Sequence, residues 1–293
     1  MERKQKGYAL ITGASRGIGK AFAGELGRQG YNLALVSLAG EDLPELAMEL
    51  AGKHHVEVRT LEINLADSDA VDEVMDWVEK QGLNVSMLVN NAGLGSVGPF
   101  HETDMHKHRA MLNLNMLTPY YLMRRLMPML QRQPQAYVIN ISSQASFFPV
   151  PFKGTYSASK AFLTYISLSS EWELRGSNVH VCVVCPSGVK TSPAIRERIE
   201  TAGPLARIVA LEPEEVVAIT LKKAFKKKRF IVPGALNRLS YYLTQLTPDF
   251  IRMAFIAKKM KKNPFDAPEA TPEKELRMEN CEAIDEVKPE GFA

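Results

Sequence analysis

Near its beginning the chain reads Thr12-Gly13-Ala14-Ser15-Arg16-Gly17-Ile18-Gly19, between an apolar run at residues 8–12 and a helical pattern at residues 18–26. Glycines at a strand-to-helix turn let the backbone approach a phosphate closely, and the helix N-terminus stabilises its charge. The spacing is G-x-x-x-G-x-G, and a glycine triplet alone also occurs in ordinary turns. Because this one lies between a strand and a helix, it predicts a site for the pyrophosphate of a nucleotide cofactor.

Short apolar runs alternate with longer helical patterns along the rest of the chain. We expect strands at residues 8–12, 32–38, 56–65, 87–89, 137–141, 179–184 and 230–232. Helical spacing occupies residues 18–26, 43–50, 71–78, 106–132, 156–175 and 214–225. Since a crossover helix separates successive strands, the strands are expected to be parallel. The pattern predicts an α/β fold, a doubly wound parallel sheet of the Rossmann type in a single domain.

Composition narrows the class of protein. Hydrophobic residues make up 45% of the 293 residues and charged residues 24%, which is typical of a soluble globular domain. The net charge of +3 gives no reason to expect nucleic acid binding. Three cysteines without a secretory signal favour a reducing, cytoplasmic location. The histidines at 101, 106 and 108 lack partners with ligand spacing, so we expect no metal site.

The last part of the chain changes in character twice. Residues 236–262 have apolar faces interrupted at Pro248 and followed by lysines. We interpret them as a helix pair on the substrate side of the domain, with contact to an anionic membrane surface as the alternative that we do not favour. From residue 263 onward acidic residues and prolines dominate. We therefore predict a folded domain at residues 4–262 and a disordered acidic tail at residues 263–293.

The residues at the end of the second predicted strand indicate which cofactor is preferred. A carboxylate at that position accepts a hydrogen bond from a free 2′-hydroxyl and repels a 2′-phosphate. The chain reads Ser37-Leu38 there, and its first acidic residue, Glu41, comes later. Arg16 lies inside the glycine loop, where its guanidinium can bind a phosphate, although a solvated loop charge is the simpler reading. Together these residues favour NADP(H) over NAD(H).

A tyrosine, a lysine and a serine form the candidate catalytic group. Tyr156 and Lys160 are four residues apart and so share one face of a helix. An ammonium beside a phenol is expected to lower the pKa of the phenol, which favours proton exchange near neutral pH. Ser143 ends the fifth predicted strand, and its hydroxyl can donate to the oxygen of a carbonyl substrate. These three residues predict carbonyl reduction or alcohol oxidation.

With these motifs in place, the chain resembles the short-chain dehydrogenase/reductase family over residues 8–232. The resemblance rests on the glycine loop, Asn90-Asn91-Ala92-Gly93, the set of Ser143, Tyr156 and Lys160, and the segment at residues 186–191. It implies that Tyr156 exchanges the proton, that Lys160 lowers its pKa and holds the nicotinamide ribose, and that Ser143 orients the substrate oxygen. It also implies that Asn115, rather than Asn113, holds a water linked to Lys160.

The resemblance assigns the cofactor to a larger set of residues, from the glycine loop to the ends of the later strands. The set is Thr12, Gly13, Ser15, Arg16, Gly17, Ile18, Gly19, Ser37, Asn64, Leu65, Asn91, Ala92, Gly93, Tyr156, Lys160, Pro186, Val189 and Thr191. Two positions depart from the family pattern. Ser187 replaces a usual glycine, and Gly188 could supply the same freedom. Asn64 stands where the family often has aspartate near the adenine, and its amide can still hydrogen-bond.

The predicted function is therefore that of an NADP(H)-dependent carbonyl reductase or alcohol dehydrogenase. Apolar residues at 147, 148, 150 and 152 favour an apolar ketone or secondary alcohol, such as a 3-oxoacyl or steroid-like compound. A carbonyl reductase of broad specificity is the alternative within the same class. A non-catalytic NADP(H)-binding regulator on the same fold is the alternative outside it. We expect a homo-oligomer, a dimer or a tetramer.

Overall fold

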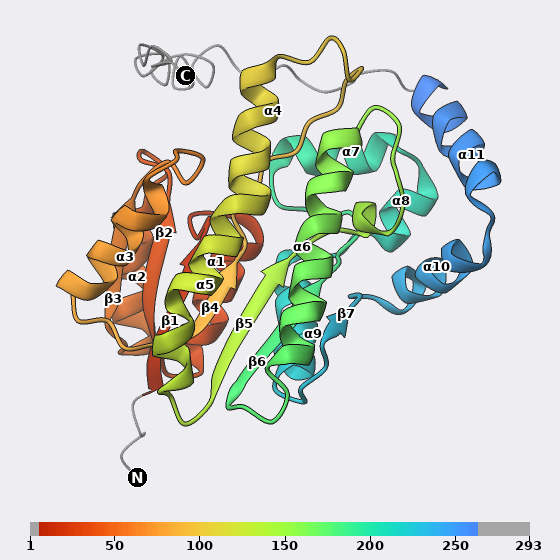
Figure 1. The fold of residues 1–293 in the computed structure, drawn as a ribbon. Helices are drawn as coiled ribbons and strands as arrows, with labels where there is room; N and C mark the ends of the chain where they lie inside the picture. The colour runs from red at the N-terminus through yellow and green to blue at the C-terminus, as the bar shows by residue number, and fades with distance from the viewer. Residues whose placement is uncertain (1–5, 263–293) are drawn as a thin grey trace, which may run out of the picture.

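The computed structural model describes residues 6–262, and the tail expected at residues 263–293 lies outside them (Figure 1). The strands are β1 (Lys6–Thr12), β2 (Tyr31–Ser37), β3 (Val58–Glu62), β4 (Val85–Asn90), β5 (Ala136–Ile141), β6 (Val179–Val184) and β7 (Phe230–Ile231). The helices are α1 (Gly17–Arg28), α2 (Leu43–His54), α3 (Ala70–Lys80), α4 (Met105–Leu112), η1 (Asn113–Leu117), α5 (Thr118–Gln131), η2 (Gln144–Phe147), α6 (Gly154–Glu173), α7 (Pro193–Thr201), α8 (Pro204–Val209), α9 (Pro213–Ala224), α10 (Ala235–Leu246) and α11 (Asp249–Lys262).

All seven strands belong to one sheet of order β3-β2-β1-β4-β5-β6-β7. Every neighbouring pair is parallel. The order reverses between β1 and β4, and in open α/β sheets a ligand binds outside the carboxyl ends of the strands at such a switch point. The doubly wound Rossmann-type sheet predicted from the sequence is confirmed.

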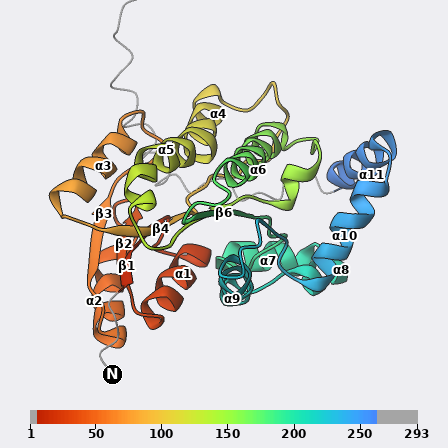
Figure 2. The same ribbon diagram turned by 60° about the horizontal axis from the view of Figure 1, so that its bottom comes forward.

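Helices cover both faces of the sheet, and strands β1, β2 and β4 to β6 are buried on both sides, whereas the edge strand β3 is partly exposed (Figure 2). Leu33, Leu35 and Met87 face one core, to which α1, α2 and α9 also contribute. Ala34 and Leu88 face the opposite core, shared with α3 and α5. Alternation along the strands thus fills two apolar layers, and this two-sided burial explains why the central strands are rich in apolar residues.

Some elements differ from the sequence prediction. The third strand, β3, spans Val58–Glu62 and is therefore shorter at both ends than the expected residues 56–65. The long helical pattern at residues 106–132 is divided by η1, a π-helix that separates α4 from α5. Helices α7 and α8 were not predicted, because Ile199 is the one residue of α7 that is buried and the apolar periodicity is too weak to detect.

The segment at residues 236–262 forms the expected helix pair, α10 and α11, at the β7 side of the molecule (Figures 1 and 2). Its inner side packs on the domain, since Tyr241 contacts Phe147 with ring centroids 4.6 Å apart. We expected the apolar residues of this segment to be covered, but Leu239, Leu243 and Leu246 are exposed. Within residues 6–262 no helix is long and apolar enough to cross a membrane.

Candidate active site

The glycine loop connects β1 to α1 at the carboxyl end of the strand. Gly13 and Gly17 have φ values of 63° and 55°, in the left-handed region that favours glycine. A Cβ on Gly19 would lie 2.0 Å from the carbonyl oxygen of Gly13, so no other residue fits there. The loop therefore turns tightly into the N-terminus of α1, where backbone N–H groups can bind a pyrophosphate.

Two side chains fix this loop against the end of β4. The Thr12 hydroxyl oxygen accepts hydrogen bonds from the backbone N–H groups of Asn91 and Ala92, each at 3.0 Å. Asn91 Nδ2 in turn donates to the carbonyl oxygens of Thr12 at 2.9 Å and Gly13 at 3.0 Å. The predicted cofactor residues after β4 therefore lie against the glycine loop, at the switch point of the sheet.

The segment after β6 joins the glycine loop to the candidate catalytic side. A Cβ on Gly17 would lie 2.9 Å from Thr191 Cβ, which places Thr191 against the loop. The Pro186 carbonyl accepts a hydrogen bond of 3.0 Å from the N–H of Gln144, the residue after Ser143. Neither Ser187 nor Gly188 has a positive φ. The glycine freedom that Gly188 could have supplied is therefore not used.

The Glu41 carboxylate lies at the end of β2, although Glu41 comes four residues after that strand in the sequence. Glu41 Oε2 accepts hydrogen bonds from Ser15 Oγ at 2.5 Å and from Ser37 Oγ at 2.9 Å. Its Oε1 lies 3.3 Å from Arg16 Nη2. The turn is made at Gly40, whose φ is 70°. Position 38 itself has no carboxylate, but the turn at Gly40 brings the Glu41 carboxylate back to the end of β2.

Asn64 and Leu65 follow β3, the position expected for adenine contacts. The Asn64 side chain bonds within its own loop, accepting from the N–H of Ala66 at 3.1 Å and donating to Asp67 Oδ1 at 2.9 Å. Leu65 is buried, and its carbonyl accepts a hydrogen bond of 2.7 Å from Thr118 Oγ1. These contacts hold the β3 end in place beside the β2 end.

Ser143 and Tyr156 lie together after β5 and at the start of α6. Ser143 is the N-cap of η2, where its Oγ accepts a hydrogen bond of 3.1 Å from the N–H of Ala145. Burial raises the pKa of Tyr156 above its ordinary value, and a hydrogen bond with Ser143 partly offsets that rise. We expected a lowered pKa because of Lys160. The expected direction is wrong for this structure, since the cost of burying a phenolate dominates.

Lys160 is buried, and its ammonium contacts backbone. Lys160 Nζ donates a hydrogen bond of 3.0 Å to the carbonyl oxygen of Ile141, at the end of β5. Burial lowers the pKa of Lys160 to about 8. A Cβ on Gly93 would lie 3.1 Å from both Lys160 Nζ and Asn115 Oδ1, so the glycine leaves room for these groups. Lys160, Gly93 and Asn115 thus lie close together, and Lys160 follows Tyr156 by about one turn of α6.

Asn115 lies in the π-helix η1 and is fully buried. Its Oδ1 accepts from the N–H of Leu94 at 2.9 Å, and its Nδ2 donates to the Leu94 carbonyl at 2.9 Å and to Ser159 Oγ at 3.1 Å. Asn113 instead donates to the carbonyl oxygen of Ala66 at 2.9 Å, away from this group. A π-helix is rare and is frequently found at functional sites, and here it turns Asn115 toward α6.

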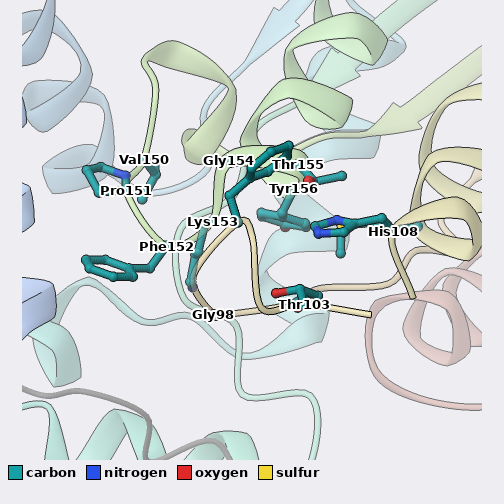
Figure 3. A pocket seen from close by; sticks show the side chains of 13 residues that line it. Gly98, Thr103, His108, Val150, Pro151, Phe152, Lys153, Gly154, Thr155 and Tyr156 are labelled. Atoms are coloured by element: carbon teal, nitrogen blue, oxygen red, sulfur yellow. The ribbon is translucent and has the colours of Figure 1, made fainter. Parts of the chain in front are cut away.

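A cavity of about 270 Å³ lies beside Tyr156, between the loop after β4, the end of α4 and the start of α6 (Figure 3). Of the apolar residues that we expected at the substrate entrance, Val150 and Phe152 line it. Phe147 instead packs against Phe230 and Tyr241, and Phe148 lies under the Arg252 guanidinium. Sequence reasoning missed His108 and Lys153, which also line the cavity.

The family model described as short chain dehydrogenase matches residues 7–201. A 7beta-hydroxysteroid dehydrogenase of Mediterraneibacter gnavus is 29% identical over 245 residues, covering 83% of this chain and 91% of that protein. The human very-long-chain 3-oxoacyl-CoA reductase is 31% identical over 191 residues, 64% of this chain and 61% of that protein.

Solved structures agree with these sequence relatives. A structure of a 7beta-hydroxysteroid dehydrogenase superposes with a TM-score of 0.78 at 27% identity, covering 87% of this chain and 98% of that one. A short-chain dehydrogenase from Sphingobium yanoikuyae, solved in complex with NADPH, has a TM-score of 0.72 at 25% identity, covering 91% of this chain and 100% of that one. Both likenesses extend over most of this chain.

Proposed function

The chain belongs to the short-chain dehydrogenase family, and we propose that it is an NADP(H)-dependent oxidoreductase that interconverts an apolar ketone and a secondary alcohol. The observation that carries the proposal is the group formed by Ser143, Tyr156 and Lys160 beside a largely apolar cavity. A 3-oxoacyl or steroid-like substrate is the class that its relatives' names suggest. A cytoplasmic location and a homo-oligomer stay predictions.

The residues present fit a nicotinamide cofactor. Gly13, Gly17 and Gly19 let the loop turn tightly at the start of α1, with Thr191 packed against Gly17, and this is the backbone shape that binds a pyrophosphate at a helix N-terminus. When bound, the cofactor supplies the hydride for reduction or accepts it in oxidation. Ser15, Arg16 and Ser37 already surround one anion, the Glu41 carboxylate. The same donors suit a 2′-phosphate, but the Glu41 carboxylate occupies them and would repel it, so the proposed use of NADP(H) requires Glu41 to leave these donors.

The protein's own groups perform the proton chemistry in this proposal. The Tyr156 hydroxyl donates a proton to the carbonyl oxygen during reduction and takes it back during oxidation. The phenol is protonated at neutral pH; burial raises its pKa and so weakens it as an acid, and the hydrogen bond with Ser143 partly offsets that rise. Ser143 donates a second hydrogen bond to the substrate oxygen, stabilising the charge that develops there. In this proposal Tyr156 is reprotonated through Lys160 and Asn115, whose Nζ and Oδ1 both lie near Gly93.

The test uses the purified full chain, NADPH or NADH, and a panel containing a 3-oxoacyl thioester, a keto-steroid and a small aliphatic ketone. We expect substrate-dependent loss of NADPH absorbance with at least one apolar ketone, and a much slower loss with the small ketone. A protein that binds NADPH tightly but turns over no member of the panel, in either direction, would support the regulator alternative instead.

A further inference from the structure

His108 is a buried histidine whose ring has no polar partner. It lies on α4 and is 9% exposed, and neither ring nitrogen makes a hydrogen bond to any residue that the structure describes. Its ring is beside Phe100, with centroids 5.8 Å apart. A buried ring nitrogen without a hydrogen-bond partner costs free energy. Two such nitrogens in one ring therefore suggest that a ligand supplies the missing partner.

The histidine faces the cavity beside Tyr156 rather than the core of the sheet. Figure 3 shows its ring pointing toward Tyr156 and Thr103, and it lines the cavity with them. The loops that form this wall are tied together, because the N–H of Gly98 donates to the Phe152 carbonyl at 2.9 Å. The imidazole is therefore part of the cavity wall, and since both of its nitrogens are buried, the ring must turn slightly for a substrate in the cavity to hydrogen-bond them.

Lys153 adds a positive charge to the same cavity. It precedes α6, lines the cavity and is partly buried. Burial lowers the pKa of Lys153, and the positive charge of Arg198 on α7 lowers it further. No aspartate or glutamate is among the residues that line the cavity. The cavity wall thus contains the His108 imidazole and the Lys153 ammonium, and none of the residues that line the cavity carries a negative charge.

We propose that His108 and Lys153 form a subsite for an anionic oxygen group, a carboxylate in the first instance, on an otherwise apolar ketone. The remaining lining is largely apolar, with Phe100, Met111 and Val150. The substrate class is therefore an amphipathic oxo acid whose ketone reaches Tyr156 while its carboxylate binds the imidazole and the ammonium. This inference rests on the proposed function for the ketone end alone.

The test compares a keto acid with its methyl ester, in a steroid pair and in an aryl pair made from benzoylpropionate. Calorimetry with NADPH present measures binding, and initial rates measure turnover. We expect the wild type to bind each acid about tenfold more tightly than its ester, since a charge-assisted hydrogen bond differs from a neutral one by roughly that factor. Lys153→Met and His108→Phe should each abolish the preference by weakening acid binding, while ester binding changes less than about twofold.

The outcomes separate this inference from the proposed reaction. Lys226→Met, on an exposed turn after α9, is the matched control and should keep the preference. Tight binding of the acids without turnover would keep the subsite and overturn the reaction. Turnover of acid and ester with equal KM, or a preference that neither variant reduces, would overturn the subsite and keep the reaction. Failure of both acids to bind would also count against the subsite.

The C-terminal helix pair, α10 and α11, has an exposed apolar face that supports a second, independent inference. Seven large apolar side chains there are exposed, from 49% for Ile251 to 81% for Leu246. They are Leu236, Leu239, Tyr242, Leu243, Leu246, Phe250 and Ile251. Contiguous apolar surface of this kind marks a contact site. Residues 235–262 also contain six basic residues and one acidic residue, although the whole chain has a net charge of only +3.

We infer that this face lies on an anionic lipid surface, the alternative that the sequence argument did not favour. Apolar side chains next to a basic segment are typical of interfacial helices. Pro248 lies between α10 and α11. It therefore interrupts neither helix, and each can lie on a membrane surface. The helix pair lies at the edge of the molecule beside β7, where a flat surface can reach it (Figure 1).

Co-sedimentation of the full chain with phosphatidylcholine vesicles, with and without phosphatidylglycerol, tests this contact. We expect binding to the anionic vesicles that weakens with salt, and at least a tenfold loss of binding in the triple variant Leu239→Ser, Leu243→Ser, Leu246→Ser. Ile208→Ser, on an exposed position of α8, is the control. Absence of binding to the anionic vesicles would overturn the inference. If the triple variant changes only the oligomeric state measured by light scattering, the face contacts a second copy of the chain instead.

Discussion

Glu41 Oε1 lies 3.3 Å from Arg16 Nη2, and the other carboxylate oxygen accepts hydrogen bonds from Ser15 and Ser37. The carboxylate thus occupies the donors that a cofactor's 2′ position would meet. Arg16 is largely exposed, with 62% of its side chain accessible, whereas the Glu41 side chain is 18% accessible. Cofactor preference therefore depends on whether Glu41 stays in place or turns away.

We expect Glu41→Gln to bind NADPH more tightly than the wild type, by roughly threefold to tenfold, because a carboxylate near a 2′-phosphate is repulsive and competes for its donors. NADH binding should weaken slightly or stay unchanged. Fluorescence titration of both cofactors measures the change. A Glu41→Gln protein that loses NADH binding and gains nothing for NADPH would show that Glu41 accepts from a 2′-hydroxyl.

Arg16→Ala should weaken NADPH binding about tenfold, the size expected for one charge-assisted contact to phosphate, and leave NADH nearly unchanged. The matched control is Arg28→Ala at the other end of α1, whose partner is Glu25 and not the glycine loop. The same titrations apply. Equal weakening of the two cofactors by Arg16→Ala would remove its role at the 2′-phosphate.

Tyr156→Phe should retain cofactor binding and lose turnover by at least about a hundredfold, since general acid catalysis contributes on that order. Tyr165→Phe, an exposed position on the same helix, is the control for removal of a phenol. Initial rates with the substrate found in the ketone panel give the answer. Turnover within a few fold of the wild type would remove Tyr156 from the proposed chemistry.

The fold could be predicted because its signals are local in the sequence. Residues 179–184 are apolar except for His180, and they form β6 with the expected bounds. The glycine loop was found for the same reason, since Gly13, Gly17 and Gly19 are required by backbone geometry within a few residues of one another. Local patterns of this kind do not depend on what the rest of the chain does.

The parts of the site that could not be predicted depend on contacts between distant segments. Glu41 meets Ser15 only because the loop reverses at Gly40. The pKa of Tyr156 is governed by burial, which no spacing of residues reveals. His108 has the appearance of one more histidine at a helix start, and its unpartnered position in the cavity wall follows from the packing of α4 against α6.

Lys160 provides a prediction that links stability to pH, because its pKa is lowered to about 8 by burial. In the unfolded chain a lysine titrates near 10.4, so the folded state binds fewer protons between these two values. Below pH 8 the buried ammonium destabilises the fold, by on the order of 3 kcal/mol for such a shift. As pH rises from about 8 toward 10.4 that cost disappears.

Lys160→Met should therefore be at least as stable as the wild type at pH 7, with the loss of the bond to the Ile141 carbonyl offsetting part of the gain. The difference in unfolding free energy between variant and wild type should shrink as pH rises from about 8 to 10. Other groups titrate in this range, but they are common to both proteins and cancel in the comparison. Urea unfolding at intervals of pH measures it, alongside turnover, which the variant should lose. A stability difference that stays constant across this range would show that Lys160 carries its charge in the folded protein at an ordinary pKa.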